Sequence, residues 1–255
     1  MIKNLYNYRE LLKSNVKKEI RGKYKGSFLG VLWSFLNPLL QVLVYAIVFP
    51  YIMRIKTENY LQYLIVGIIP WTFFTTVLTQ GMITVRINAG IIKKVYFPRE
   101  ILPISVALSG LVNFFISCLI ILLFCIIGGL GVSWHLVLLP VFAIIQFFLT
   151  LGIVLALSAI NIYIKDVEYI VQFIINMLFY ATPILYPTTL FPKKIRWVLY
   201  MNPLTELIEA YRDIFIYHQL PSVLSILYLI VITTVIFFIG LLIFRKLEKG
   251  FAEEV

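Results

Sequence analysis

Long uncharged runs separated by short charged segments dominate the pattern of the chain. The runs cover residues 26–53, 59–85, 101–164, 169–192 and 214–244. Each is longer than the roughly 20 apolar residues that an α-helix needs to cross about 30 Å of hydrocarbon. The pattern therefore predicts an all-α integral membrane protein and excludes a soluble globular fold.

The run 101–164 is too long for a single helix crossing. Its middle holds Gly128, Gly129 and Gly131, followed by Trp134, which is typical of a turn at the membrane interface. This run therefore predicts a hairpin of two spans. The six transmembrane helices expected are roughly 31–53, 61–84, 101–127, 136–162, 169–186 and 223–244.

The distribution of basic residues predicts the orientation. The chain carries 22 Lys and Arg against 12 Asp and Glu, and sixteen of the 22 fall on the face that holds both termini, against six on the other. Because cytoplasmic loops are enriched in Lys and Arg, both termini are expected to be cytoplasmic. Basic residues in short loops between apolar runs favour membrane lipids, and no nucleic acid, as the counter-charge.

The segment before the first span has an amphipathic pattern. Leu5, Tyr8, Leu12, Val16 and Ile20 recur at steps of three and four residues. Residues 1–27 therefore predict a cytoplasmic helix lying flat at the membrane interface, although a solvated helix that touches nothing stays open. The basic residues assigned to this interface helix are Lys13, Lys17, Lys18, Arg21, Lys23 and Lys25.

The last outer loop, about 186–221, is the longest connector. Its prolines interrupt any helix early, and an apolar stripe at helical spacing follows them. We expect short re-entrant gate helices between spans 5 and 6 at an outer mouth, with an ordinary helix on the outer leaflet as the alternative. The gate candidates are Tyr186, Pro187, Pro192 and Tyr211.

Charged side chains are absent from all six spans as drawn, which disfavours a proton-coupled or ion-coupled carrier. The sequence has no GxxxxGK[ST] phosphate-binding loop, and His135 and His218 lie far apart in outer loops. We therefore expect no catalytic residue, metal or cofactor in this chain. The acids Asp166 and Glu168 on an inner loop leave a membrane-embedded transferase as one alternative.

Aromatic residues make up 16% of the chain, and many fall inside the spans. An uncharged interior with aromatic rings suits a conduit for sugars, because sugar C–H faces rest on such rings through weak contacts that permit movement. A place in the interfacial belt or the core remains the alternative for each ring. The channel candidates are Trp33, Phe35, Tyr45, Phe49, Trp71, Phe74, Phe173, Phe179 and Tyr180.

Four sequence blocks, in order, carry a family resemblance. They are residues 21–39, which begin RGKYKGSFLG, then 91–103 (IIKKVYFPREILP), 164–169 (IKDVEY) and 200–203 (YMNP). These blocks resemble ABC-2 type polysaccharide exporter permeases, above all the O-antigen and teichoic acid export permeases. The resemblance spans nearly the whole chain and makes residues 28–255 a six-span transmembrane domain.

The resemblance implies a homodimer that encloses a channel in the inner (plasma) membrane of a bacterium. Two copies of a separate nucleotide-binding subunit would bind ATP and Mg, so this chain would not itself be an enzyme. The implied substrate is a lipid-linked polysaccharide, O-antigen first and teichoic acid next, in lipopolysaccharide biosynthesis. An exporter of a small hydrophobic drug or lipid is a further alternative.

The same resemblance makes the loop at about 86–100 the contact with the ATPase. Tyr96 and Phe97 are expected to be apolar side chains exposed on a short cytoplasmic loop with a basic rim, as in a protein interface. Alternatively, these rings dip into the lipid headgroups. The residues assigned to coupling are Lys93, Lys94, Tyr96, Phe97, Pro98, Arg99 and Glu100.

Overall fold

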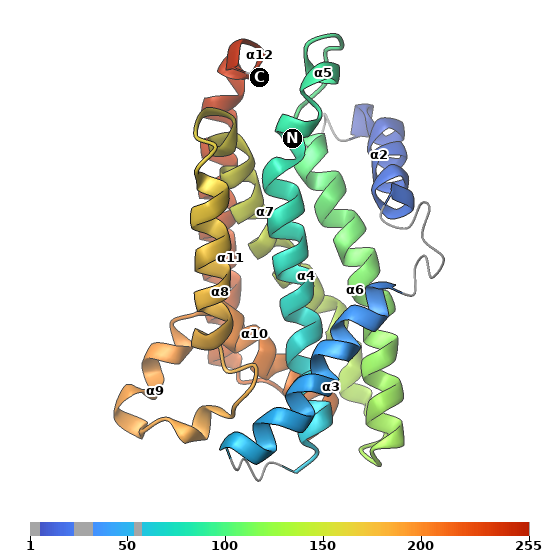
Figure 1. Ribbon diagram of the computed structural model, residues 1–255, viewed down its shortest axis with the longest axis vertical. Helices are drawn as coiled ribbons and strands as arrows, with labels where there is room; N and C mark the ends of the chain where they lie inside the picture. The colour runs from blue at the N-terminus through green and yellow to red at the C-terminus, as the bar shows by residue number, and fades with distance from the viewer. Residues whose placement is uncertain (1–5, 23–32, 54–57, 255) are drawn as a thin grey trace.

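The computed structural model describes residues 6–22, 33–53 and 58–254, and within them all regular structure is helical (Figure 1). Four long helices run along the molecule side by side. They are α4 (Tyr60–Ile87), α6 (Ile101–Ile127), α7 (Leu139–Tyr163, preceded by the 3-10 turn η2, Trp134–Leu138) and α11 (Val223–Leu247). All four are long and apolar enough to cross a membrane, so the protein is a multi-pass membrane protein.

Two further apolar helices flank the four long ones. Helix α3 (Trp33–Met53) has 21 residues and agrees with the first span expected, whereas α8 (Val167–Ala181) has 15 residues and ends earlier than the span expected there. At 1.5 Å per residue, α8 is about 22 Å long, less than the hydrocarbon thickness. It ends before residue 186 because Thr182 is extended and precedes Pro183, a position where helical backbone is disfavoured.

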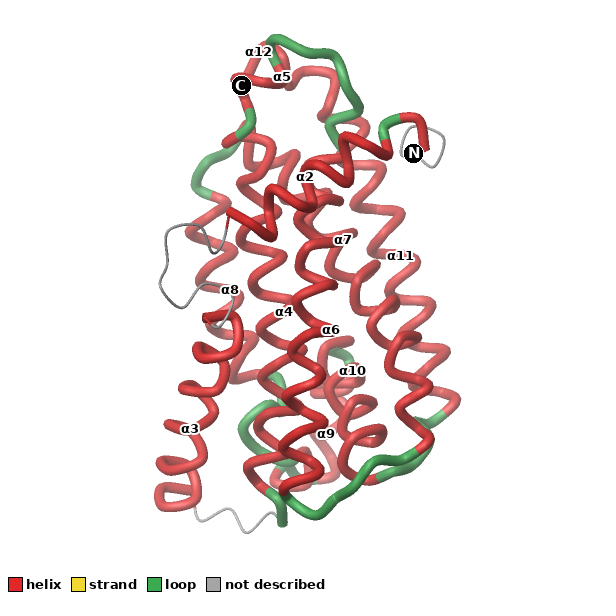
Figure 2. Tube along the Cα trace, turned by 90° about the vertical axis from the view of Figure 1, so that its right-hand side faces the viewer, coloured by secondary structure: helices red, strands yellow, loops and turns green. Residues whose placement is uncertain are grey.

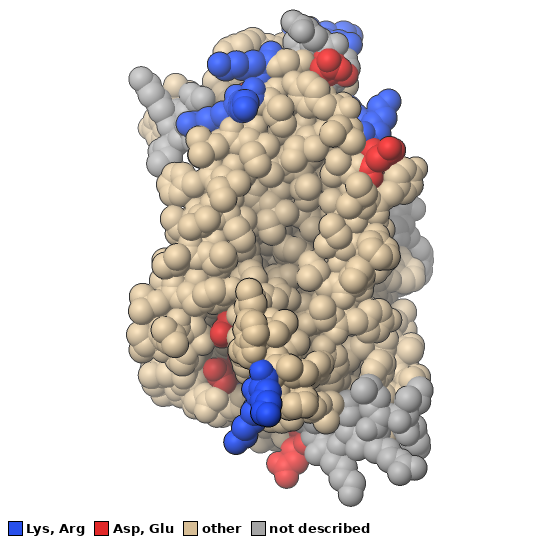
Figure 3. Space-filling view, turned by 90° about the vertical axis from the view of Figure 1, so that its left-hand side faces the viewer, with Lys and Arg blue, Asp and Glu red and all other residues tan. Residues whose placement is uncertain are grey.

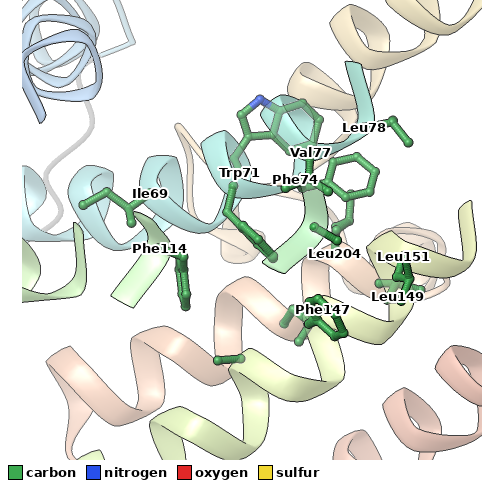
Figure 4. Close-up of a cluster of buried hydrophobic side chains, with 14 of the residues drawn as sticks. Ile69, Trp71, Phe74, Val77, Leu78, Phe114, Phe147, Leu149, Leu151 and Leu204 are labelled. Carbon is green, nitrogen blue, oxygen red and sulfur yellow. The ribbon is translucent and has the colours of Figure 1, made fainter. Parts of the chain in front are cut away.

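Helix α4 forms the centre of the bundle. It is the most buried of the four long helices, and it packs against α6 and α7. Trp71, Phe74 and Val77 of α4 lie in a buried cluster together with Phe114 of α6 and Phe147 of α7 (Figure 4). This core positions the helices that flank α4.

The closest helix crossing joins α7 and α11. A side chain added at Gly240 would overlap the backbone of Gly152, and one added at Gly152 would overlap the backbone of Phe237. Small residues allow two helices to approach until their backbones touch, as is common in membranes. The crossing holds α11, most of whose surface is exposed, against the bundle.

At the end of the bundle expected to be cytoplasmic lie α2 (Arg9–Gly22), α5 (Ala89–Ile92), the 3-10 turn η5 (Glu248–Gly250) and α12 (Phe251–Glu254) (Figure 1). Helix α2 is inclined across the long helices (Figure 2). The helix predicted in the N-terminal segment is confirmed. Lys23, Lys25 and residues 26–30 of the first resemblance block lie outside the described residues.

The opposite end contains the segment between α8 and α11. It folds into short pieces, which are η3 (Thr188–Leu190), α9 (Lys193–Tyr200), α10 (Pro203–Arg212) and the π-helical turn η4 (Asp213–Tyr217). Asn202 caps α10 by accepting a hydrogen bond from the Leu204 amide at 3.0 Å, and Pro203 occupies the first helical position. The short helices expected here are present, whereas their role as a gate stays a prediction.

Charged residues gather toward the two ends of the molecule. On the face in Figure 3, a band of uncharged side chains separates basic and acidic residues at one end from those at the other. Uncharged surface of this kind is what the hydrocarbon of a bilayer requires.

Candidate functional site

The loop between α4 and α6 projects from one end of the bundle (Figure 1). It consists of α5 and a turn over residues 93–100, and the Tyr96 side chain is 90% exposed. Lys93, Lys94 and Val95 beside it are exposed as well. The loop thus presents one aromatic ring with two cations next to it, a composition that favours a protein contact.

Phe97 does not share this exposure. Its side chain is only 7% exposed and belongs to the buried core cluster, so the expectation of two exposed aromatic rings is wrong for Phe97. Sequence alone does not tell which of two adjacent rings faces inward on an irregular loop. Tyr96 is the available contact residue, and Phe97 anchors the loop.

Arg99 ties this loop to the C-terminal end of the chain. Its Nη1 donates to the Glu248 carbonyl at 2.7 Å, and its backbone amide donates to Glu248 Oε1 at 3.3 Å. The guanidinium also lies 5.8 Å from the centre of the Phe251 ring. A cleft of about 420 Å³ separates the loop from Arg245 and Lys249, and Glu100 is buried beneath it.

Helix α2 contacts the bundle through its apolar stripe. Leu12, Val16 and Ile20 face Leu108 and Leu111 of α6 across an apolar cavity. The alternative of a helix that touches nothing is therefore wrong. On the helix surface, Lys13 and Lys17 are exposed, which suits a cytoplasmic membrane surface.

A hydrogen bond joins α2 to the end of α4. Lys18 Nζ donates to Asn88 Oδ1 at 3.3 Å, and Asn88 directly precedes α5. The remaining basic residue of α2 in the assigned set, Arg21, is exposed. The interface helix therefore touches the base of the loop that carries Tyr96.

Glu168 at the start of α8 has defined partners. It forms an ion pair with Arg86 of α4 and accepts a hydrogen bond from Asn161 Nδ2 at 3.0 Å. Because the carboxylate joins three helices, we interpret it as a structural group, while Asp166 beside it is exposed. Across 6–22, 33–53 and 58–254, no group of three His, Cys, Asp or Glu residues is placed to hold a metal.

The aromatic channel candidates fall into two groups. Trp71, Phe74 and Phe179 are buried, and the rings of Trp71 and Phe179 lie 5.6 Å apart. Tyr45, half-buried, contacts Phe179 at 5.9 Å and Phe49 at 5.6 Å. These rings join α3, α4 and α8 inside one subunit.

The second group faces outward. Trp33, Phe173 and Tyr180 are exposed, and α8 buries only Val171, Ile175 and Phe179. Of Phe35 only the backbone lies within the described part of the chain. An outward aromatic face on a helix at membrane depth is available to lipid, to a second copy or to a transported chain.

At the end of the bundle expected to be the outer one, Arg212 is completely buried, with 0% of its surface exposed. Its Nη1 donates to the Pro183 carbonyl at 2.7 Å and to Glu209 Oε1 at 2.6 Å, and Nη2 donates to the Ile184 carbonyl at 2.9 Å. The guanidinium carbon also lies 3.4 Å from the centre of the Tyr63 ring. Counted in the sequence as one of the outer-face charges, Arg212 is instead a core residue.

The same turn after α8 receives two tyrosines of α4. Tyr60 Oη donates to the Leu185 carbonyl at 2.8 Å, and Tyr63 Oη donates to the Tyr186 carbonyl at 3.0 Å. Asn202 Nδ2 adds a hydrogen bond to Thr182 Oγ1 at 2.9 Å. Residues 182–186 are therefore fastened to α4 and α10 at several points.

The four gate candidates occupy different environments. Tyr186 is half-buried and its hydroxyl donates to the Tyr180 carbonyl at 2.6 Å. Tyr211 is fully buried, and its hydroxyl donates to Gln146 Oε1 at 2.9 Å. Pro187 is half-buried and Pro192 is exposed. Tyr211 therefore joins α10 to Gln146 of α7, while the other three lie closer to the surface.

Three acidic residues, Glu206, Glu209 and Asp213, lie close together in the segment between α8 and α11. Burial raises the pKa of Glu206 and of Asp213, and the carboxylate of Glu209 near both adds to the rise. A hydrogen bond from Ser225 opposes the rise at Glu206, and one from Gln219 opposes it at Asp213. The outer segment thus carries carboxyl groups that are harder to ionise than usual.

The sequence of this helical bundle matches that of known membrane proteins. Residues 10–216 match the family model described as ABC-2 type transporter. The chain belongs to the ABC-2 type transporter family. Among its ABC-2 relatives, the chain is 36% identical over 257 residues to the O-antigen export system permease protein RfbA of Myxococcus xanthus, with 100% of this chain and 99% of the relative covered.

Two further ABC-2 relatives have the following similarity. A permease protein RfbA of the O-antigen export system in Klebsiella pneumoniae is 37% identical over 248 residues, which cover 96% of this chain and 94% of the relative. The polysialic acid transport protein KpsM of Escherichia coli is 24% identical over 247 residues, which cover 91% and 92%. The family resemblance noted in the sequence is confirmed.

Two structural features of this ABC-2 chain could not be predicted from its sequence. One is the attachment of Arg99 to Glu248, which joins residues 149 positions apart. The other is the burial of Arg212, which the count of basic residues places on the outer face. The i,i+3 spacing of Glu209 and Arg212 was the available local signal.

Proposed function

We propose that this chain is the membrane subunit of an ATP-driven exporter that moves lipid-linked O-antigen from the cytoplasmic side to the outer face of the bacterial inner membrane. The proposal rests on the similarity of this chain, at 36% and 37% identity along nearly its whole length, to permeases named for O-antigen export. The four apolar spans and the uncharged band between the charged ends support a passage through the membrane.

The proposal includes six crossings and two copies of the chain. The apolar helices α3 and α8 would supply the two remaining crossings, and the bilayer would thin locally around α8 because that helix is short. The exposed rings of Phe173 and Tyr180 favour contact with a second copy or with the transported chain. Both termini face the cytoplasm in this arrangement because the larger share of Lys and Arg lies on their side.

Energy would come from a separate ATPase subunit that binds ATP and Mg. We assign its contact to the loop over residues 93–100, where exposed Tyr96 stands beside Lys93 and Lys94. Arg99 would pass movement of the loop to the C-terminal end through Glu248. Short helices α9 and α10 would form the outer gate, with residues 182–186 as its fixed base.

Deletion of the gene in its own bacterium tests this function. We expect lipid-linked O-antigen to accumulate on the cytoplasmic face of the inner membrane and to disappear from the cell surface. Reintroduction of the wild-type chain should restore surface O-antigen. A deletion strain with normal surface O-antigen would overturn the proposal, and loss of a different surface polymer, such as an acidic capsule, would reassign the substrate.

A further inference from the structure

A cavity lined by both polar and apolar side chains lies between α3, α4 and α6. Its volume is about 280 Å³, close to the lower end of ordinary ligand pockets at about 300 Å³. Along α4, Gln80 and Thr72 lie about 10 and about 22 Å from Ile87 at 1.5 Å per residue. The cavity therefore lies inside the span and away from both aqueous ends.

Six of the lining side chains carry uncharged hydrogen-bonding groups. They are Asn37 of α3, Thr72, Thr76 and Gln80 of α4, and Asn113 and Ser117 of α6. None of the lining residues is charged. Rings complete the wall, with Trp33 at the surface and Phe73 and Phe114 buried behind it.

These polar side chains differ from others in the same helices. Thr75 and Thr79 donate to carbonyls three and four residues earlier in α4, and Ser105 and Ser109 donate to carbonyls three residues earlier in α6. Within the described ranges, the six cavity side chains form no hydrogen bond with the chain. Their donors and acceptors are thus left for an occupant, since an unpaired polar group in hydrocarbon is unfavourable.

The chemistry of the wall defines the occupant. Carboxamides and hydroxyls both donate and accept, which matches the hydroxyl groups of a sugar. An aromatic ring offers a face for the C–H side of a sugar ring. An ion is disfavoured because the wall offers no opposite charge, and a fatty chain is disfavoured because it would leave the polar groups unpaired.

We propose that this cavity binds a neutral, hydroxyl-bearing sugar unit of the transported glycan, held by the carboxamides of Gln80 and Asn113 with Trp33 at its mouth. The proposal rests on the proposed function of the chain and adds the place of contact. The threonine row of α4, together with α6, would then line part of the route.

Thiol labelling tests the site directly in the permease with its ATPase subunit in lipid vesicles. Asn113→Cys should react with a small methanethiosulfonate reagent, because a sugar site on the transport route would be reached by water. Glycan chains cleaved from the O-antigen of the bacterium that makes this permease should slow this reaction at least tenfold. The wild-type chain supplies the baseline, since Cys118 and Cys125 are buried.

Two control variants define the result. Lys165→Cys, on an exposed loop, should react with and without glycan, and Leu119→Cys, on the outward face of α6, should react in neither case. Unprotected reaction of the Asn113→Cys variant would overturn the proposal. An Asn113→Cys variant that never reacts would also overturn it, because lipid or a second copy would then fill the cavity.

A transport measurement separates this inference from the proposed function. Gln80→Leu combined with Asn113→Leu should raise the KM for glycan export about tenfold, with assembly of the complex measured in parallel. Thr79→Val is the matched control, because its hydroxyl is bonded within α4, and its KM should not change. If the wild-type complex exports O-antigen and the double variant matches it, the sugar site fails and the function stands. If the wild-type complex exports no O-antigen, the function fails.

Discussion

The two ends of the bundle, outer and cytoplasmic in the proposed orientation, are built in opposite ways. At the outer end, Arg212 of α10 is buried and its guanidinium donates to the backbone carbonyls of Pro183 and Ile184. At the cytoplasmic end, the loop that carries Tyr96 projects outward and is held by Phe97 and by Arg99. The polar groups of Arg212 are used within the fold, while Tyr96 and the lysines beside it at the tip of the loop stay exposed.

This difference indicates a division of roles. A buried charge whose partners are all internal fixes one conformation, because removal of any partner leaves a charge or carbonyl unpaired in a low-dielectric surrounding. An exposed ring on an anchored loop costs the fold little and is available to a partner. We therefore expect mutations at the outer end to affect folding and mutations at the tip of the cytoplasmic loop to affect assembly.

The largest effect is expected for Arg212→Met. The change leaves Glu209 and two carbonyls without their donor, and loss of one partner from a buried pair lowers stability by about 3–5 kcal/mol. Thermal unfolding of the purified protein in detergent measures it. Lys194→Met on exposed α9 is the control and should behave as wild type. An Arg212→Met protein as stable as wild type would contradict a fixed outer end.

The double variant Glu209→Met with Arg212→Met sharpens the same comparison. It removes the uncompensated carboxylate as well as the guanidinium, so part of the lost stability should return. If the double variant is less stable than Arg212→Met alone, Glu209 stabilises this end by contacts other than the ion pair. If Arg212→Met alone fails to fold, recovery of a folded protein in the double variant provides the same test.

Next in size is Phe97→Ala. The side chain is buried at the base of the cytoplasmic loop, and its loss leaves a cavity that lowers stability by about 3 kcal/mol, the lower end for Phe→Ala in a core. Limited proteolysis of the protein should cut faster within residues 93–100, and the ATPase subunit should bind less. Unchanged protease resistance would show that Phe97 is no anchor.

Tyr96→Ala should separate assembly from folding. Because this side chain is 90% exposed, its removal should change stability by less than about 0.5 kcal/mol. If the ring is a hot spot for the ATPase, binding weakens by about 2 kcal/mol, or roughly 30-fold in Kd. Co-purification with the ATPase subunit and a melting curve on the same sample provide both readouts. Unchanged capture would remove the coupling assignment.

The smallest effect concerns pH at the outer end. Burial raises the folded-state pKa of Glu206 above its unfolded value. The folded state therefore binds this proton more tightly, so stability is greater below the unfolded pKa and falls as pH rises through the folded pKa. Melting curves between about pH 4 and about pH 8 should show this slope in wild type and less of it in Glu206→Gln. Identical slopes would exclude Glu206 as its source.

Much of the helical layout could be predicted from the sequence. Uncharged runs set the positions of α4, α6, α7 and α11, because the bilayer demands continuous apolar helix. The end of α8 was misplaced by several residues, since Pro183 acts only through the local backbone at Thr182. Composition therefore predicts the spans, whereas the end of α8 depends on the local backbone conformation.

The site was less accessible to prediction. The charge count places Arg212 among the basic residues of the outer face, but it does not reveal that Tyr63 of α4 and the turn after α8 cover its side chain. Likewise, Tyr96 and Phe97 are adjacent aromatic residues, yet one side chain is exposed and the other is buried. The six cavity residues come from three helices, and nothing in their spacing along the chain brings Asn37 near Asn113.

The central claim is that this chain supplies the passage and a separate ATPase supplies the energy. Vesicles that contain the purified chain, with lipid-linked O-antigen on the face equivalent to the cytoplasm, test it most directly. With the ATPase subunit and ATP, glycan should appear on the opposite face; without that subunit, it should stay where it began. Accumulation against a gradient by this chain alone would contradict the account.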